Sequence, residues 1–195
     1  MPVVGKRFRD ALVWAAELHE DQKRKGGSIP YVAHLLGVAA IVLEHGGDED
    51  EAIAALLHDA LEDQRHKMST GEIRARFGET VEAIVEACTD GDPEEQRDRD
   101  PVKWKVRKEK YIADIPQKPA GAILVSMADK LHNARAILED YRVMGDALWP
   151  RFTAGKDGTL WYYRALLGAY AARGKTRLWT ELERTVAAIE GKAPA

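Results

Sequence analysis

Apolar residues recur at helical spacing along most of the chain, and this periodicity limits the possible folds more than any other feature of the sequence. In an amphipathic helix apolar residues return every three to four positions, whereas a half-buried strand alternates apolar and polar residues. Strict alternation is nearly absent from these 195 residues. We therefore predict an all-α fold.

Glycines, prolines and capping residues divide the periodic pattern into separate helices. The capping box of Asp48 and Glu51 predicts the start of a third helix, which is expected to continue through the residues 58–63. Residues 90–101 contain no apolar side chain other than proline and predict a loop, a candidate lid or insertion. The other expected helices cover residues 7–22, 30–45, 71–77, 79–88, 102–114, 122–138 and 176–189, with an aromatic helix that begins at Leu160.

Length and composition fit one domain. An apolar content of 45% with five tryptophans is enough for one core, and no internal repeat divides the sequence. We expect a single domain over residues 1–195, in which helices within residues 157–190 complete the bundle. The sequence shows no signal peptide and no run of about 18 apolar residues, so the expected location is the cytoplasm, without membrane contact.

Charge and cysteine content narrow the classes of ligand. The net charge of −3 does not supply the positive field of a protein that binds nucleic acids. A small phosphorylated ligand needs only a local positive cluster, and Lys23–Lys25 is a candidate for it. Cys88 is the only cysteine, which excludes an intrachain disulfide and a thiolate metal cluster. A bound metal would therefore use His, Asp or Glu.

Four ionisable residues, His58, Asp59, Glu62 and Asp63, lie close together inside an otherwise apolar stretch. A surface helix with a polar face would also give this pattern. Asp129 lies in the middle of a second apolar stretch, where a carboxylate needs a cation, hydrogen bonds or a shifted pKa. A continuous helix would present the first pair of the cluster and the second pair, four residues later, on one face.

Together with His34, three of these residues form a candidate set of metal ligands with nitrogen and oxygen atoms. Such sets of nitrogen and oxygen suit manganese, iron or zinc, and helical bundles commonly build metal sites from facing helices. Two imidazoles and two carboxylates come from three expected helices: His34, His58, Asp59 and Asp129.

Several segments carry a resemblance to a known family. The four residues of the mixed set match, in order, the signature of the HD superfamily of metal-dependent phosphohydrolases. Residues 24–34, 58–63 and 128–135 more specifically resemble the hydrolase domain of RelA/SpoT-type enzymes and the small alarmone hydrolases. The resemblance extends from about residue 7 to about residue 138.

The resemblance implies a single-domain HD helical bundle with one Mn²⁺ ion per chain. The implied ligands are His34, His58, Asp59 and Asp129. Glu62 and Asp63 would handle the attacking water, because a carboxylate beside a metal-bound water can orient it or take its proton. The implied reaction is hydrolysis of the 3′-pyrophosphate of (p)ppGpp to GDP or GTP and pyrophosphate.

The resemblance also implies the groups that contact the nucleotide. Arg24 would stack on the purine through its planar guanidinium, with Lys25 beside it. The remaining implied contacts are Asn133, Tyr162 and Lys156, the last two to the ribose and the 5′-phosphate. The histidines outside the motifs are expected to be structural or exposed: His19, His45, His66 and His132.

The identity of the nucleotide is open at this point. The loop over residues 89–96 and the segment with Trp104, Arg107 and Lys108 depart from the alarmone enzymes. Such loops often decide which base and phosphates are accepted. Adenosine alarmones, NADPH or a nucleoside monophosphate are alternative substrates, and an inactive nucleotide-sensing module is an alternative function. The oligomeric state is also open.

Overall fold

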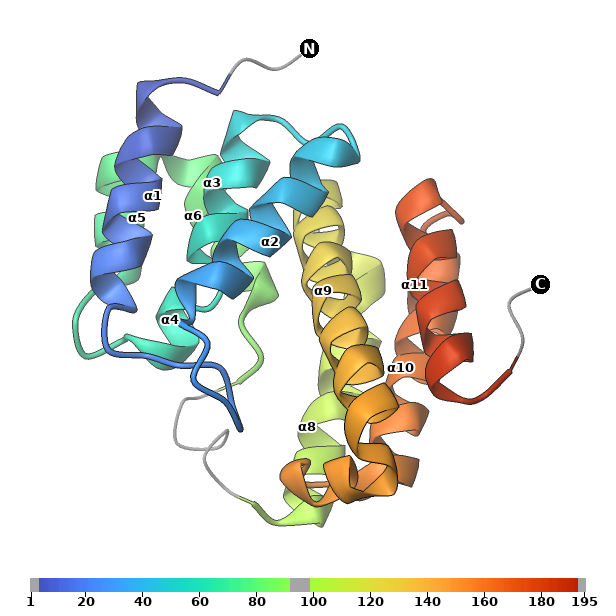
Figure 1. Cartoon of the computed structure of the whole chain (residues 1–195). Coiled ribbons are helices and arrows are strands. Elements are labelled where there is room, and N and C mark those ends of the chain that lie inside the picture. Colours follow the sequence, from blue (N-terminus) through green and yellow to red (C-terminus); the bar gives the residue numbers. More distant parts are fainter. Residues whose placement is uncertain (1–3, 92–98, 193–195) are drawn as a thin grey trace. The chain divides into compact units, whose positions relative to one another are not determined.

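The computed structural model describes residues 4–91 and 99–192, and in these ranges all regular elements are helices (Figure 1). The prediction of an all-α fold is confirmed. The chain forms two compact units, and each is described separately. The first consists of Met1–Thr89 and Pro119–Asp129, and the second of Asp90–Lys118 and Lys130–Ala195.

The first unit is built around α3 (Glu49–Leu57). All residues from Ala52 to Leu57 are fully buried, because α3 is apolar on every side and packs against α1, α2 and α6. Its start is fixed by the expected capping box, in which the Asp48 carboxylate accepts from Glu51 N–H and the Glu51 carboxylate accepts from Asp48 N–H, both at 2.9 Å. The other elements are α1 (Lys6–Leu18), α2 (Val32–Glu44), α4 (Ala60–Asp63), α5 (Thr70–Phe77), α6 (Glu79–Cys88) and the first part of α9 (Ala120–Met144).

The prediction that the third helix continues through residues 58–63 is wrong. The structure ends α3 at Leu57 and starts a separate short helix, α4, at Ala60. The His58 ring hydrogen-bonds the Ala55 carbonyl oxygen at 2.7 Å, and this is the oxygen that would accept the Asp59 N–H in a regular helix. The side chain thus competes with the backbone for that carbonyl, and the helix breaks where the two charged pairs were expected to share one face.

The second unit contains α8 (Pro101–Asp114), η1 (Ile115–Gln117), the rest of α9, η2 (Gly145–Arg151), α10 (Gly155–Ala171) and α11 (Arg177–Ile189). Helix α10 packs against α8, η1, η2 and α11. It begins five residues before the expected Leu160, and the expected connector before it holds η2. Residues 92–98 of the expected loop lie outside the described part of the chain.

Two other helix ends differ from expectation. Helix α1 stops at Leu18 rather than near Gln22, because Gln22 N–H bonds the His19 carbonyl oxygen in a turn. Helix α9 is longer than expected and spans 25 residues. None of the helices in the described ranges is long and apolar enough to cross a membrane.

Candidate metal centre

The four predicted ligands come together in the first unit. His34 lies in the first turn of α2, His58 and Asp59 form the turn between α3 and α4, and Asp129 lies on α9. Both histidines are almost fully buried, and the Asp59 and Asp129 side chains are 17% and 9% exposed. The burial of two carboxylates beside two imidazoles requires positive charge at this point.

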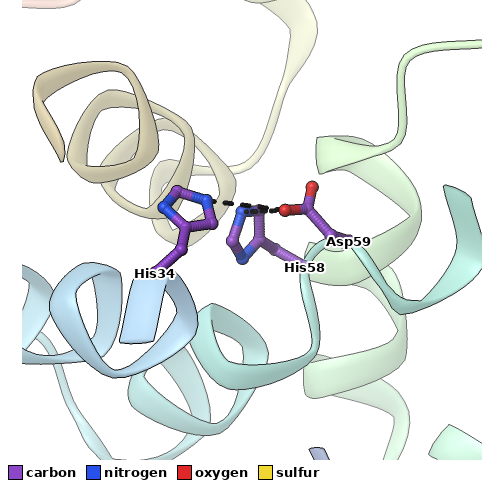
Figure 2. Close-up of side chains that lie close together, drawn as sticks. All are labelled: His34, His58 and Asp59. Atoms are coloured by element: carbon purple, nitrogen blue, oxygen red, sulfur yellow. Dashed lines mark ion pairs between the residues drawn. The ribbon is translucent and has the colours of Figure 1, made fainter. Parts of the chain in front are cut away.

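The ligand atoms of His34, His58 and Asp59 point toward one another (Figure 2). Asp59 Oδ2 lies 3.0 Å from His58 Nε2 and 3.5 Å from His34 Nε2. Asp129 Oδ1 lies 3.2 Å from His34 Nε2 and 3.7 Å from His58 Nε2. Each carboxylate therefore faces both rings through one oxygen atom.

Neighbouring groups orient these ligands. The His58 ring bonds the Ala55 carbonyl oxygen through Nδ1, so this nitrogen carries the proton and Nε2 faces the carboxylates. Among the described residues His58 Nε2 has no hydrogen-bond partner of good geometry. The Tyr31 hydroxyl donates to Asp59 Oδ2 at 2.6 Å. A backbone carbonyl behind a histidine and a donor behind a carboxylate are typical supports of metal ligands.

Burial and charge shift the pKa values of this cluster. Burial alone would lower the pKa of His58, but the nearby Asp59 and Asp129 raise it well above its usual value. Burial alone would raise the pKa of Asp59, but His58 and His34 hold it well below its usual range. Burial and the Asp59 charge raise the pKa of Tyr31, which keeps its hydroxyl a donor. The Asp59 carboxylate thus stays ionised in this buried site because of its positive partners.

The set fits a divalent cation. Two neutral imidazoles and two carboxylates would neutralise its charge, and His58 Nε2, which faces the carboxylates without a well-aligned hydrogen bond, would become a ligand atom. One oxygen of Asp59 and one nitrogen from each histidine lie within 4.8 Å of one another. The residues present therefore suit a divalent metal ion.

Both predicted water-handling residues lie on α4, beside the cluster in sequence. Glu62 and Asp63 are half-buried. Asp63 Oδ2 accepts a hydrogen bond from Gln22 Nε2 at 2.6 Å. Burial and the Asp59 charge raise the pKa of Asp63, although the Gln22 hydrogen bond opposes this. A carboxylate with a raised pKa close to a metal is suited to exchange a proton with water.

The segment that carries Arg24 and Lys25 is a short hairpin-like loop between α1 and α2. Arg24 N–H donates to the Ile29 carbonyl oxygen at 2.8 Å, and Tyr31 N–H donates to that of Gln22 at 2.9 Å. Gly26 adopts a φ of +80° at the turn. Arg24 is half-buried and Lys25 is exposed. The loop places both basic residues in the same segment as Tyr31.

The other predicted substrate contacts belong to the second unit. Asn133 follows Asp129 by one turn of α9 and is half-buried. Tyr162 is buried, with its ring 5.9 Å from that of Trp104 and 5.0 Å from Lys108 Nζ. Lys156 already bonds Asp146 Oδ1 at 2.9 Å and the Tyr141 hydroxyl at 3.1 Å. Asp146 first, and then Tyr141, raise the pKa of Lys156, so it stays charged.

The sequence analysis assigned no role to Tyr31, Gln22 and Gln64, and it expected His19 to be structural or exposed. Tyr31 precedes His34 by three residues, and its place before a ligand-bearing helix was the only available signal. Gln22 meets its partner Asp63 across 41 residues of sequence, a separation that periodicity cannot bridge.

A family model for the HD domain matches residues 11–160. The chain belongs to the HD domain family. Its curated relatives include guanosine-3′,5′-bis(diphosphate) 3′-pyrophosphohydrolases from Xenopus tropicalis, 40% identical over 129 residues, and from Aquifex aeolicus, 35% identical over 136 residues. These matches cover 65% and 70% of this HD domain chain. They span 66% of the length of the frog protein and 18% of that of the bacterial protein.

Solved structures extend the likeness of this HD domain chain beyond the motifs. A structure described as a metazoan ortholog of SpoT that hydrolyses ppGpp superposes with a TM-score of 0.74 at 26% identity, over 95% of this chain and 96% of the other. The structure of lmo0812 from Listeria monocytogenes gives a TM-score of 0.69 at 28% identity, over 82% and 99% of the two chains. The expected HD fold is confirmed.

Proposed function

We propose that this HD domain protein removes the 3′-pyrophosphate of a guanosine or adenosine alarmone in a manganese-dependent reaction. The observation that carries the proposal is the convergence of His34, His58, Asp59 and Asp129, with Asp63 on the adjoining helix. The names of the relatives in three organisms support the same reaction class. The acidic net charge is compatible with a small phosphorylated substrate, because such a substrate needs only a local cluster of positive groups.

The protein groups have separate tasks in the proposed reaction. His34, His58, Asp59 and Asp129 would hold the ion, which when bound would acidify a water molecule and offset charge on phosphoryl oxygens. Glu62 and Asp63 orient the water and take its proton. The water oxygen bonds to the phosphorus attached to ribose O3′, the bond from that phosphorus to O3′ breaks, and O3′ receives a proton. Pyrophosphate and the nucleoside 5′-phosphate are the products.

Substrate contacts complete the proposal. Arg24 stacks on the purine and Lys25 approaches a phosphate, since both lie on the loop that enters α2. Asn133, Tyr162 and Lys156 contact the rest of the nucleotide. Lys156 would have to exchange its bonds to Asp146 and Tyr141 for a phosphate, so its contribution is expected to be the smallest.

Pyrophosphate release from ppGpp and ppApp, measured with manganese and after chelation, tests the function. We expect release that chelation stops and that Asp59→Ala abolishes. Asp10→Ala removes a carboxylate that is 52% exposed on α1 and serves as the matched control, with unchanged release. Absence of release from both alarmones would refute the proposal. Cleavage of NADPH or of a nucleoside monophosphate alone would favour the alternative phosphohydrolase, and binding without cleavage would favour the sensor.

A further inference from the structure

Gln22 lies at the centre of a partly buried hydrogen-bond network that the proposed reaction does not yet use. Its carbonyl oxygen Oε1 is bonded by His19 Nδ1 and by Gln64 Nε2, both at 2.7 Å. Its amide nitrogen Nε2 donates to Asp63 Oδ2 at 2.6 Å. His19 and Gln64 are only 2% and 7% exposed. Hydrogen bonds in such a partly buried network restrict the orientation of the groups that they join.

The donors and acceptors allow one orientation of the Gln22 amide when Asp63 is ionised. A carboxylate accepts only, so it needs the NH₂ group of Gln22, and Oε1 must then face the other two partners. A flipped amide would place oxygen against the Asp63 carboxylate. His19 and Gln64 both donate to Oε1 and fill its two lone pairs, which leaves Asp63 as the acceptor that the NH₂ group faces.

His19 is held in the form that donates through Nδ1. Burial lowers the pKa of His19, so the ring is neutral near neutral pH and carries one proton. That proton lies on Nδ1, toward Gln22, and Nε2 is buried without a hydrogen-bond partner among the described residues. The ring also stacks on Tyr31, at 5.1 Å between centroids, and Tyr31 bonds the predicted metal ligand Asp59. His19 thus contacts both Gln22, which bonds Asp63, and Tyr31, which bonds Asp59.

The backbone keeps this segment in place. Gln22 N–H donates to the His19 carbonyl oxygen at 3.0 Å, and the Gln22 carbonyl oxygen accepts from Tyr31 N–H at 2.9 Å. Lys67 Nζ bonds the Leu18 carbonyl oxygen at 3.0 Å. The end of α1 and the loop that follows it are therefore tied to the chain on both sides of Gln22.

We propose that Gln22, fixed by His19 and Gln64, is a positioning residue for Asp63. By occupying Oδ2, Gln22 fixes the orientation of the carboxylate and leaves Oδ1 as the oxygen that meets the attacking water. Within the described residues no side chain donates to Oδ1. The inference rests on the proposed function, because it gives Asp63 its water-handling role.

Two amide substitutions of His19 separate positioning from packing. His19→Asn keeps a donor close to the place of Nδ1, whereas His19→Gln moves the donor to the place of Nε2. We expect His19→Gln and Gln22→Met to lower kcat about 10- to 100-fold, the size expected for a misplaced catalytic group. KM and the manganese affinity should stay unchanged, and His19→Asn should retain kcat. His66→Gln, at an exposed histidine, is the control and should match the wild type.

Equal losses of kcat in His19→Asn and His19→Gln would overturn the proposal, as would a loss confined to KM or to manganese affinity. Gln22→Glu keeps the shape of the side chain and removes the donor, so it serves if Gln22→Met does not fold. It should lose kcat to a similar extent.

A measurement that does not depend on enzymatic turnover separates this inference from the proposed function. In metal-free protein, the side-chain amide protons of Gln22 should exchange slowly with solvent in ¹H–¹⁵N NMR spectra. The protected signal should survive in His19→Asn and be lost in His19→Gln and in Asp63→Ala. If no nucleotide is cleaved by the wild type, the proposed function fails, and this signal still decides whether Gln22 holds Asp63. A Gln22 amide that exchanges as fast as exposed amides overturns the inference.

Discussion

At the scale of single residues, Tyr31 supports the predicted metal ligand Asp59. Its hydroxyl donates to Asp59 Oδ2, the oxygen that also faces both imidazoles. We expect Tyr31→Phe to weaken manganese affinity about 10- to 100-fold, the usual effect of removing such a support. Isothermal titration calorimetry measures this change. Tyr141→Phe, which loses a hydroxyl contact with Asp146 in the second unit, should leave the affinity unaltered.

The pH dependence of stability follows from His58. Its pKa is raised in the folded, metal-free protein by Asp59 and Asp129, above an unfolded value of about 6.5. A raised pKa contributes stability that is complete below the unfolded value and is lost as the pH rises through the folded value. Metal binding needs the neutral ring, so stabilisation by metal grows as the pH rises.

We therefore expect the difference in Tm between manganese-loaded and metal-free protein to increase from about pH 6 to about pH 8.5. Thermal melts in both forms across this range measure it. A difference that is constant with pH would mean that the metal does not compete with a proton on His58. Asp59→Ala should remove the difference at every pH, because it deletes a predicted ligand.

The cluster of predicted ligands could be identified from sequence, while the residues that bond to it could not. His34, His58, Asp59 and Asp129 stand out because charged side chains in apolar helices need partners, and the structure brings all four together. Gln22 is an ordinary polar residue in a turn. Its proposed role depends on the hydrogen bond to Asp63, which forms only after α1 and α4 have packed into the same unit.

At the scale of helices, sequence patterns predicted the bounds best where a glycine, a proline or a capping residue lies at the helix ends. The bounds of α2, α5, α6, α8 and α11 lie within about two residues of expectation, the usual uncertainty of helix ends. The break between α3 and α4 was missed, because no breaker such as glycine or proline marks it. It arises from the side chain of His58, which takes a backbone acceptor from its own helix.

Gly47, between α2 and α3, packs closely against Val42 of α2 and also lies near Leu124 of α9. A Cβ atom there would lie 2.4 Å from Val42 Cγ1, 2.9 Å from the Val42 carbonyl oxygen and 3.1 Å from Leu124 Cδ2. We expect Gly47→Ala to lower the free energy of unfolding by about 1–3 kcal/mol, the usual cost of forcing extra volume into a packed core. Urea unfolding measures the loss.

Gly168→Ala is the matched control for this prediction. Gly168 lies in α10, is exposed, and has open space around a built Cβ atom. The same substitution should raise the free energy of unfolding by about 0.5–1 kcal/mol, because alanine favours the helix. A Gly47→Ala variant as stable as the wild type would contradict the close packing at that position.

At the scale of the whole molecule, the prediction of one domain over residues 1–195 can be tested through the tryptophans. Helix α9 contributes residues to both compact units, so neither unit has a complete set of helices without it. Trp14 is the only tryptophan in the first unit. The others belong to the second unit: Trp104, Trp149, Trp161 and Trp179. A Trp14→Phe variant therefore reports on the second unit alone.

The predicted metal ligands lie in the first unit, so manganese should stabilise the second only if the two unfold together. At a hundredfold excess over Kd, binding adds about 2.7 kcal/mol, or about 5–10 °C in Tm for a domain of this size. We expect tryptophan fluorescence of Trp14→Phe to show this shift and to coincide with the transition in far-UV circular dichroism. Comparison of the same variant with and without manganese cancels any cost of the substitution. The chain unfolds as two domains if the Tm from fluorescence is the same with and without manganese, while circular dichroism shows a second transition whose Tm rises with manganese.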